Sequence, residues 1–323
     1  MTIEEIKPQS YPLISIVLPV YNGGTYLASS VESVIDQPLK NFELLILDDC
    51  SSDDSWKYIK SIKDQRISIY KNEVNKGLFY NLNYLIKNCR SPLIKLWAQD
   101  DIMHPHCLET FVSFHQNNPS IGFSYCGCDI INEKGIIKRI DEIDNTPEIV
   151  STELHARIAF FTGSIAGNIS NVCINKKALN IAGWFNVGMK ISADFDMWVR
   201  LAKDHNTGFI ADKLIQLRDH GGQLSRKESL YINHVKEDLI VYRNLFSYVS
   251  PEMKKEGLML LRNHKLVFYY TLMVKALIKG NLKTAYSFYK ELSAFDNFYK
   301  LTSFFIKNKL NRPHTPNLLK PVI

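Results

Sequence analysis

Two adjacent carboxylates, Asp100 and Asp101, follow a short apolar run at residues 93–97. Paired carboxylates supply the hard oxygen ligands that a divalent cation such as Mg²⁺ or Mn²⁺ prefers, and such an ion commonly binds one or two carboxylates together with substrate phosphates. The same pair could instead form a turn in which an aspartate caps the following helix. The spacing alone leaves both interpretations open.

A second carboxylate pair, Asp48 and Asp49, ends the apolar run at residues 42–48. A carboxylate at the edge of a sheet can accept a hydrogen bond from the imide N–H of a pyrimidine, and the ring of Tyr21 could stack on the same base. The alternative is again a turn that caps a helix. A uracil or thymine base would satisfy Asp49 and Tyr21 together.

The elements that must position these residues alternate along the first 125 residues. Short apolar runs predict four strands, at residues 14–20, 42–48, 66–70 and 93–97. Apolar residues at helical spacing, such as Leu27, Val31 and Val34, predict helices between them. Repeated β-α-β units predict an α/β fold with a mostly parallel sheet and helices on both of its faces.

Ligands of such sheets bind beyond the carboxyl ends of the strands. Besides the two carboxylate pairs and Tyr21, the residues at these ends include Asn22, Lys76 and Gly77. We therefore expect Asn22, Lys76 and Gly77 to contact a bound nucleotide.

The later part of the chain differs in pattern. Residues 126–225 carry short strands, a Gly-rich turn and one helix, which suggests a mixed half-sheet, and residues 226–323 are helical in pattern, with breaks near Pro251 and Gly280. We expect a catalytic domain over residues 1–225, with a nucleotide-binding half at about 1–125 and an acceptor half after it. The helical region would form a C-terminal extension.

The composition restricts the class of protein. With 46% hydrophobic and 22% charged residues, the 323-residue chain is ordinary globular material, and no apolar stretch reaches the roughly 20 residues of a membrane span. The six scattered cysteines lack the paired spacing of a zinc site, and with no signal peptide in the sequence we expect a cytoplasmic protein. The absence of G-x-G-x-x-G after the first strand and of a P-loop motif disfavours dinucleotide redox chemistry and P-loop hydrolysis.

Several segments occur in order along the chain: SIVLPVYNGGTYLASSVESVIDQ, FELLILDDCSSDDS, NKGLFYNLN, KLWAQDD, NISNVCINKKAL, ADFDMWVRL and LRDHGGQLS. Together they resemble the family 2 glycosyltransferases with the GT-A fold, over residues 15–225. The resemblance implies a nucleotide-diphospho-sugar transferase sheet flanked by helices, a nucleotide-sugar donor, in this family most often a UDP-sugar, and a divalent metal, Mn²⁺ or Mg²⁺.

The resemblance also implies roles for individual residues in the nucleotide half. It assigns the base pocket to Asp49, with Pro19 and Tyr21 beside it. Its D-x-D-like motif ends in Asp100 and Asp101, where Asp101 is the usual metal ligand and Asp100 lies near the ribose and the sugar.

In the acceptor half, the family's general base matches Asp194. The Glu that precedes this base in the family motif is replaced by Ala193, and this departure leaves Asp196 as a rival base or as a helix brace. An inactive nucleotide-sugar-binding or scaffold subunit of a glycan-assembly complex is therefore the alternative function.

The resemblance places His220 near the diphosphate or the metal, with Arg218 and Arg226 as candidates for the phosphates. It implies a single displacement with inversion at the anomeric carbon. Because the Q-x-x-R-W motif and the membrane spans of processive synthases are absent, we expect one sugar per encounter, transferred to a saccharide or lipid-linked acceptor in bacterial surface polysaccharide or glycolipid assembly.

The helical C-terminal region is basic. Residues 226–323 contain 17 Lys and Arg against 7 Asp and Glu, a net charge of +10. One interpretation is a helical appendage that packs on the catalytic domain or pairs two protomers. The other is a peripheral membrane surface, in which lysines meet anionic headgroups at the inner face of the cell membrane while aromatic rings occupy the interface. Nucleic acid is disfavoured because no recognised module accompanies the charge.

Overall fold

The computed structural model describes residues 11–139, 145–223 and 230–310. Within them, ten strands form one sheet: β1 (Ile14–Val20), β2 (Phe42–Asp48), β3 (Ile67–Lys71), β4 (Leu93–Leu96), β5 (Ile102–Met103), β6 (Phe123–Ile131), β7 (Ile137–Arg139), β8 (Ile149–Val150), β9 (Val172–Asn175) and β10 (Thr207–Arg218). The four strands predicted near the N-terminus are confirmed, with bounds that differ by at most one residue.

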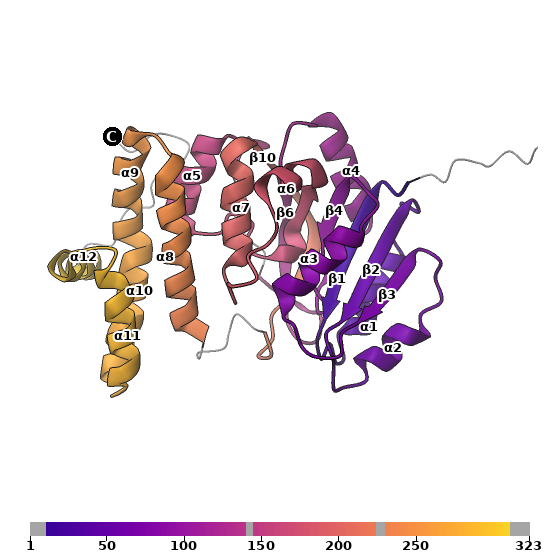
Figure 1. Cartoon of the computed structure of the whole chain (residues 1–323), viewed down its shortest axis with the longest axis horizontal. Coiled ribbons are helices and arrows are strands. Elements are labelled where there is room, and N and C mark those ends of the chain that lie inside the picture. The colour runs from indigo at the N-terminus through magenta and orange to yellow at the C-terminus, as the bar shows by residue number, and fades with distance from the viewer. Residues whose placement is uncertain (1–10, 140–144, 224–229, 311–323) are drawn as a thin grey trace, which may run out of the picture.

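Helices cover the sheet and continue beyond it (Figure 1). Those interleaved with the strands are α1 (Leu27–Ile35), α2 (Ser55–Ser61), α3 (Leu78–Asn88), α4 (Cys107–Asn117), α5 (Thr152–Thr162), α6 (Lys176–Ala182) and α7 (Ala193–Asp204). The C-terminal helices are α8 (Tyr231–Tyr248), α9 (Pro251–Leu261), α10 (Val267–Ile278), α11 (Leu282–Ser293) and α12 (Phe298–Leu310), with one π-helical turn between α9 and α10. Both predicted breaks are confirmed, because Pro251 begins α9 and Gly280 lies between α10 and α11.

The sheet is parallel around β1 and mixed beyond β4. Its order is β3-β2-β1-β4-β9-β6-β10-β5, with β7 and β8 paired at β6 and β10. Strands β1 to β4 run parallel, whereas β9 lies antiparallel between β4 and β6. The chain moves from β1 to β2 and β3 on one side and then returns to β4 on the other, so the carboxyl ends of β1 and β4 flank a topological switch point where ligands of such sheets bind.

Both faces of the sheet are buried. On one face, Ile14, Ile16 and Leu18 of β1 pack with Val31 of α1 and Phe111 of α4. On the other face, a second apolar cluster extends from β1 and α3 through α7 into the C-terminal helices. Because β1 is enclosed on both faces, its sequence is apolar almost throughout rather than alternating.

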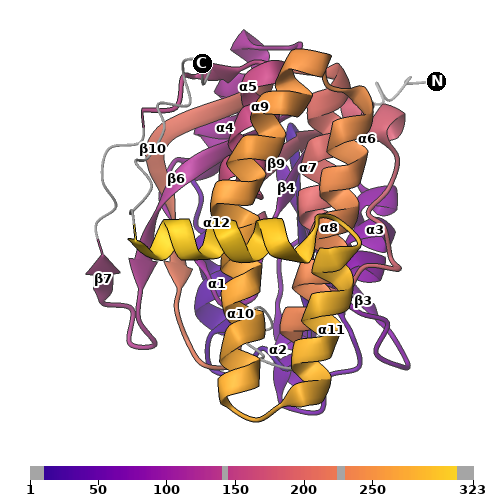
Figure 2. The ribbon, with the colours of Figure 1, turned by 90° about the vertical axis from the view of Figure 1, so that its left-hand side faces the viewer.

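The C-terminal helices share this second core. Tyr242 of α8 stacks on Phe160 of α5, and Tyr269, Tyr270 and Phe288 of α10 and α11 are buried. For these rings, the interpretation that the C-terminal helices pack on the catalytic part is confirmed. The domain boundary at residue 225 stays a prediction. Figure 2 shows α8 to α12 covering the end of the molecule opposite β3, and in the described part of the chain no helix has the length and apolar character to cross a bilayer.

Candidate active site

A cavity of about 630 Å³ opens at the carboxyl ends of β1 and β4. Its lining combines the loop after β1, the turn after β4 and three segments from the second half of the chain, at residues 167–169, 190–194 and 220–223. The charged side chains among its described lining residues are those of Asp100, Lys190 and Asp194, together with the titratable His220. Six residues that the sequence predicted for the site therefore line one cavity, namely Pro19, Tyr21, Asn22, Asp100, Asp194 and His220.

The loop after β1 is fixed by side chains of the next β-α connection. The backbone N–H groups of Asn22, Gly23 and Gly24 donate to Ser51 Oγ, Ser55 Oγ and Asp53 Oδ2 at 2.9 to 3.0 Å. These donors are consumed inside the protein, so the loop does not present them as a phosphate cradle.

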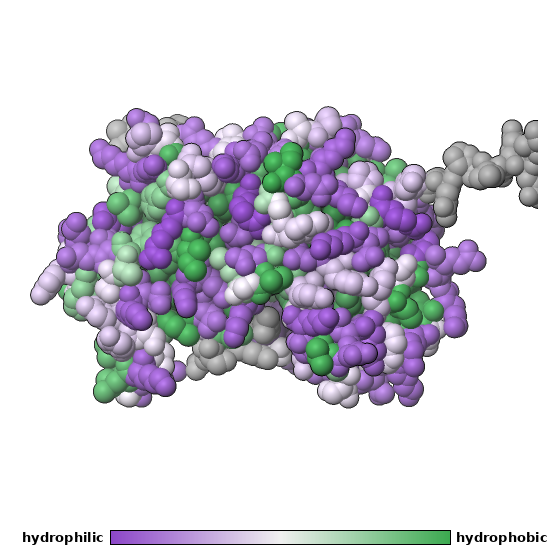
Figure 3. All heavy atoms as spheres, viewed as in Figure 1, coloured by the Kyte–Doolittle hydropathy of each residue, from purple (hydrophilic) through white to green (hydrophobic). Residues whose placement is uncertain are grey.

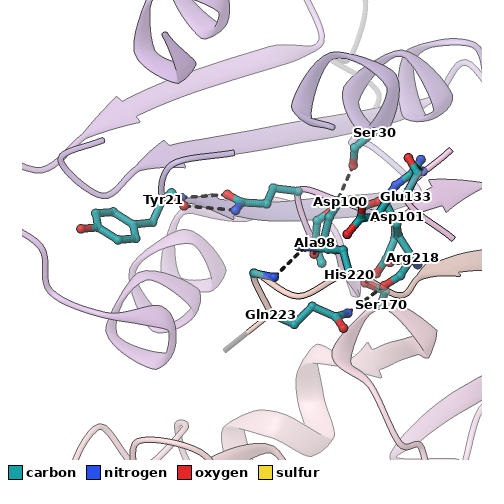
Figure 4. A network of polar contacts seen from close by, with 12 residues as sticks. Tyr21, Ser30, Ala98, Asp100, Asp101, Glu133, Ser170, Arg218, His220 and Gln223 are labelled. Atoms are coloured by element: carbon teal, nitrogen blue, oxygen red, sulfur yellow. Dashed lines mark hydrogen bonds and ion pairs between the residues drawn. The ribbon is translucent and has the colours of Figure 1, made fainter. Parts of the chain in front are cut away.

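Tyr21 lies at the mouth of the cavity. Gln99 holds it by the backbone, since its Oε1 accepts from Tyr21 N–H at 2.8 Å and its Nε2 donates to Tyr21 O at 3.1 Å. The ring is half exposed and points away from the carboxylates of Asp100 and Asp101 (Figure 4). Tyr21 is thus available for stacking on a planar ligand, and Pro19 lines the same cavity from β1.

Asp49 is buried directly beneath the β3-α3 loop. Its Oδ1 accepts hydrogen bonds from Asn72 Nδ2 at 2.7 Å and from Lys76 N–H at 2.8 Å, and its Oδ2 accepts from Gly77 N–H at 2.9 Å. This carboxylate organises the 72–77 loop, in which Gly77 has a φ of +86° that favours glycine. Contact of Asp49 with a base stays a prediction, and it would add a fourth donor to a carboxylate that already accepts three.

The two aspartates after β4 have different surroundings. Asp100 lines the cavity, whereas Asp101 is 2% exposed and lies behind it. Asp101 Oδ2 accepts from Ser170 Oγ at 2.5 Å and its Oδ1 accepts from Arg218 N–H at 2.9 Å. Burial, followed by the charge of Asp100, raises the pKa of Asp101 to about 7 even though these hydrogen bonds lower it.

His220 pairs with Asp100 across the cavity wall. Its Nε2 lies 2.9 Å from Asp100 Oδ2, and its Nδ1 accepts from Gly222 N–H at 3.2 Å. Because Nδ1 is the acceptor, the neutral imidazole carries its proton on Nε2 and donates it to Asp100. The ring also lies against Tyr26, with ring centroids 5.0 Å apart.

Arg218 is an internal strut rather than a cavity cation. Its Nε donates to Asp100 O at 2.9 Å, and its Nη1 donates to the carbonyls of Asn132 and Glu133 at 3.1 and 3.2 Å. Figure 4 shows this guanidinium joining the turn after β4 to the β6-β7 turn. It is 6% exposed and does not line the cavity, and Arg226 lies outside the described residues.

The donor set for a cation is partial. Across the described ranges, no cluster of three or more His, Cys, Asp or Glu side chains forms a ready metal site. Asp100 and His220 line the cavity, and a cation completed by substrate phosphates needs only one or two carboxylates. Asp100 fits that role directly, whereas Asp101 must exchange a hydrogen bond from Ser170 or Arg218 to bind metal.

Asp194, in the first turn of α7, also lines the cavity. Burial, together with the nearby charges of Asp238 and Glu237, raises the pKa of this carboxyl to about 7. Its rival Asp196 is 5% exposed and pairs with Arg200 at 2.8 Å, which makes it a helix brace. A carboxylate with such a pKa can act as a general base near neutral pH.

The segment that leads into α7 is held by α8. Glu237 Oε1 accepts from Lys190 N–H, and its Oε2 accepts from Ile191 N–H and Ser192 N–H, all at 2.9 Å. Next to it, Asp238 accepts from Ser192 Oγ at 2.6 Å. The C-terminal helices therefore fix the position of the helix that carries Asp194.

Sequence reasoning missed three residues of this site. Lys190 is the one Lys or Arg among the described cavity-lining residues, and its place four residues before Asp194 was the available signal. Tyr26 lies under both His220 and Arg218, and Glu237 acts from α8. Nothing in the local sequence pairs Glu237 with the loop that it holds.

Comparison with curated proteins shows that this chain is similar in sequence to glycosyltransferases. An uncharacterized glycosyltransferase from Rickettsia conorii is 28% identical over 264 residues, which are 80% of this chain and 42% of that protein. The chain thus spans less than half of that relative. A further relative is the Escherichia coli UDP-Glc:alpha-D-GlcNAc-diphosphoundecaprenol beta-1,3-glucosyltransferase WfgD, 28% identical over 206 residues, covering 62% of this chain and 76% of WfgD.

Comparison with solved structures identifies the fold. S. aureus TarS 1-349 superposes with a TM-score of 0.65 at 16% identity, covering 91% of this chain and 88% of that one. The complex of the same protein with UDP-GlcNAc gives a TM-score of 0.62 at 14% identity, covering 77% and 70%. The structure is therefore a GT-A fold with C-terminal helices, as the resemblance implied. Residues 15–172 match the family model for glycosyl transferase family 2, which assigns this segment of the chain to that family.

Proposed function

We propose that this protein is an inverting glycosyltransferase that moves one sugar from a UDP-sugar to a hydroxyl group of an acceptor. The observation that carries the proposal is that Asp194, whose carboxyl has a pKa of about 7, lines the same cavity as the Asp100–His220 pair. A solved TarS complex contains UDP-GlcNAc, and WfgD is named for a UDP-glucose donor, which supports a UDP-sugar here.

In this mechanism Asp194 removes the proton of the acceptor hydroxyl. The acceptor oxygen then attacks the anomeric carbon on the face opposite the nucleotide, the bond from that carbon to the diphosphate oxygen breaks, and UDP leaves. One displacement inverts the anomeric configuration, and general-base assistance typically contributes about 10²- to 10⁴-fold to the rate.

The leaving diphosphate needs positive charge. Lys190 at the cavity can supply hydrogen bonds to the phosphates, whereas the Nε2–H of His220 donates to Asp100 and must exchange that bond to reach them. A divalent cation, Mn²⁺ or Mg²⁺, would neutralise the leaving charge when bound, and Asp100, with Asp101 after its hydrogen bonds rearrange, would hold it.

The acceptor and the place of action complete the proposal. WfgD is named for a diphosphoundecaprenol-linked acceptor, and we propose a saccharide or lipid-linked acceptor of bacterial surface polysaccharide or glycolipid assembly. The protein would act in the cytoplasm at the inner face of the cell membrane.

The inactive-subunit alternative derives from Ala193. That residue is fully buried in α7 and does not line the cavity, and the carboxylates near Asp194 come instead from Glu237 and Asp238 of α8. The base function therefore does not depend on the missing side chain, and the enzyme is favoured over the scaffold.

An assay of sugar transfer tests the proposal. A panel of UDP-sugars is offered together with lipid-linked and soluble acceptors, and transfer is measured by the release of UDP. Asp194→Asn should abolish transfer and keep UDP-sugar affinity within about twofold, because the amide preserves shape and removes the base. Asp196→Asn is the matched control from the same helix and should retain transfer. Full transfer by Asp194→Asn, or none by the unmodified protein with any acceptor, contradicts the proposal.

A further inference from the structure

The turn between α10 and α11 exposes a group of large apolar side chains. Ile278 is 81% exposed, Leu282 is 70% exposed and Tyr286 is 66% exposed. Leu277 is also exposed beside them. Single exposed apolar residues are ordinary, but a contiguous group of this kind marks an interaction surface.

These residues do not belong to the faces by which the two helices pack. The packed faces bury Tyr269, Met273 and Ala276 of α10 and Ala285, Phe288 and Leu292 of α11. Between the helices, Gly280 has a φ of +73°, and Asn281 Oδ1 accepts from Thr284 N–H to cap α11. This tight turn directs Ile278 and Leu282 outward at the tip of the helical pair.

Within residues 257–290, the charged side chains next to the tip are all lysines. Exposed lysines at 275, 279, 283 and 290 flank the apolar group, and the sequence contains no Asp or Glu between Glu256 and Glu291. A partner that complements this surface must offer negative charges to the lysines and apolar groups to the exposed side chains. A second copy of the chain fits poorly, because a two-fold contact would bring these lysines together without a carboxylate of this segment to pair them.

The tip lies at the end of the molecule where the cavity opens. Figures 1 and 2 show the α10–α11 turn at the same end as α1, which begins just after the loop that follows β1. Figure 3 shows hydrophobic atoms at the surface of this tip. A groove of about 1040 Å³ runs from Lys279 and Asn281 to Asp238, whose carboxylate binds Ser192, two residues before Asp194.

We infer that the α10–α11 turn is a membrane-contact site that inserts Ile278 and Leu282 into the interface of an anionic phospholipid bilayer. Tyr286 lies at headgroup level, and the flanking lysines bind the phosphate groups. The inference deepens the proposed function, because it orients the cavity toward a membrane-borne acceptor, but bilayer binding itself does not require that the protein be a glycosyltransferase.

Co-sedimentation of the full chain with vesicles tests this site. One set contains phosphatidylethanolamine and phosphatidylglycerol, and the other contains phosphatidylcholine only. The unmodified protein should bind the anionic vesicles, and Ile278→Asp/Leu282→Asp should reduce that binding about tenfold or more. Lys279→Glu/Lys283→Glu should weaken binding to anionic vesicles similarly.

Ile181→Asp is the matched control, because Ile181 of α6 is 68% exposed and lies outside the tip. It should bind vesicles as the unmodified protein does, and transfer to a soluble acceptor should be equal in all variants. Absence of binding by the unmodified protein, or equal binding by the tip variants, overturns the inference. Self-association that the tip variants abolish, without vesicle binding, also overturns it and assigns the tip to a contact between copies. Because vesicle binding and transfer are measured separately, loss of the proposed activity would leave this result interpretable.

Discussion

The Oε2 atom of Glu237 accepts a 2.9 Å hydrogen bond from the backbone N–H of Ser192, the N-cap residue of α7. Glu237 belongs to α8, whereas α7 carries Asp194 into the cavity. The C-terminal helices are thus part of the mechanical support of the site. The C-terminal helices also act on the electrostatics of Asp194, the proposed general base, because Asp238 and Glu237 of α8 are among the charges that raise its pKa.

Glu237→Gln should therefore weaken both stability and turnover. Three backbone N–H groups donate to the carboxylate, and an amide offers a single oxygen, so at least one buried donor loses its acceptor. The expected cost is about 1–3 kcal/mol in the free energy of unfolding. Denaturant unfolding and kcat with the donor saturating measure the two effects. Glu252→Gln, at an exposed position of α9, is the control and should change neither.

The rate of transfer should depend on the ionisation of Asp194. With a pKa of about 7, the carboxyl is protonated below neutrality and cannot act as a base. We expect kcat to rise about tenfold per pH unit below pH 7 and to level off above about pH 8. A pH profile that is flat between pH 5 and pH 8 would exclude Asp194 as the base.

The same pKa has a consequence for stability. The folded-state pKa of about 7 lies above the ordinary value of 3.8, so the stability associated with protonated Asp194 is fully present below about pH 4 and is lost as pH rises through 7. The Asp194→Asn variant has no carboxyl to ionise and does not lose this stability. The difference in unfolding free energy, variant minus unmodified protein, should therefore increase by a few kcal/mol between pH 4 and pH 8. Chemical denaturation at both pH values measures the difference. A constant difference across this range would contradict the raised pKa.

Much of the fold follows from local sequence. The apolar runs of β1 and β2 are long and uninterrupted because both faces of the sheet are covered, and this made their bounds predictable. Strand ends then located Tyr21, Asn22 and Asp100 at one edge, and all three line the cavity.

What the sequence could not show depends on residues that meet only after folding. Arg218 has the chemistry of a phosphate ligand, but the carbonyls of Asn132 and Glu133 accept its donors. Asp101 directly follows Asp100 of the cavity wall, yet Ser170 from a distant segment donates a hydrogen bond to its buried carboxylate. In the same way α10 is apolar around most of its circumference, so its periodicity does not tell which rings are covered and leaves the exposed Ile278 unnoticed.

Asp101→Asn should separate the metal function from the fold. The amide oxygen can still accept from Arg218 N–H, and the amide nitrogen can donate to Ser170 Oγ, so the buried hydrogen bonds persist. We expect the melting temperature without ligand to change little, and the additional rise that Mn²⁺ gives over UDP alone to disappear. The rise with UDP alone is the internal control. An unchanged Mn²⁺-dependent rise would show that Asp101 does not bind the cation.

Arg218→Lys distinguishes an internal strut from a phosphate ligand. The guanidinium serves three carbonyl oxygens, those of Asp100, Asn132 and Glu133, and a single ammonium group cannot reproduce this planar arrangement. If Arg218 is a strut, the variant should lose about 2 kcal/mol of unfolding free energy even without ligand. If Arg218 is instead a phosphate ligand, the variant should keep its stability and lose UDP affinity in a salt-dependent way. Arg90→Lys is the matched control, since Arg90 is 53% exposed and its pairing with Glu43 is screened by solvent, so this variant should lose less than about 1 kcal/mol. Unfolding curves and UDP titrations of both variants at two salt concentrations decide between these roles.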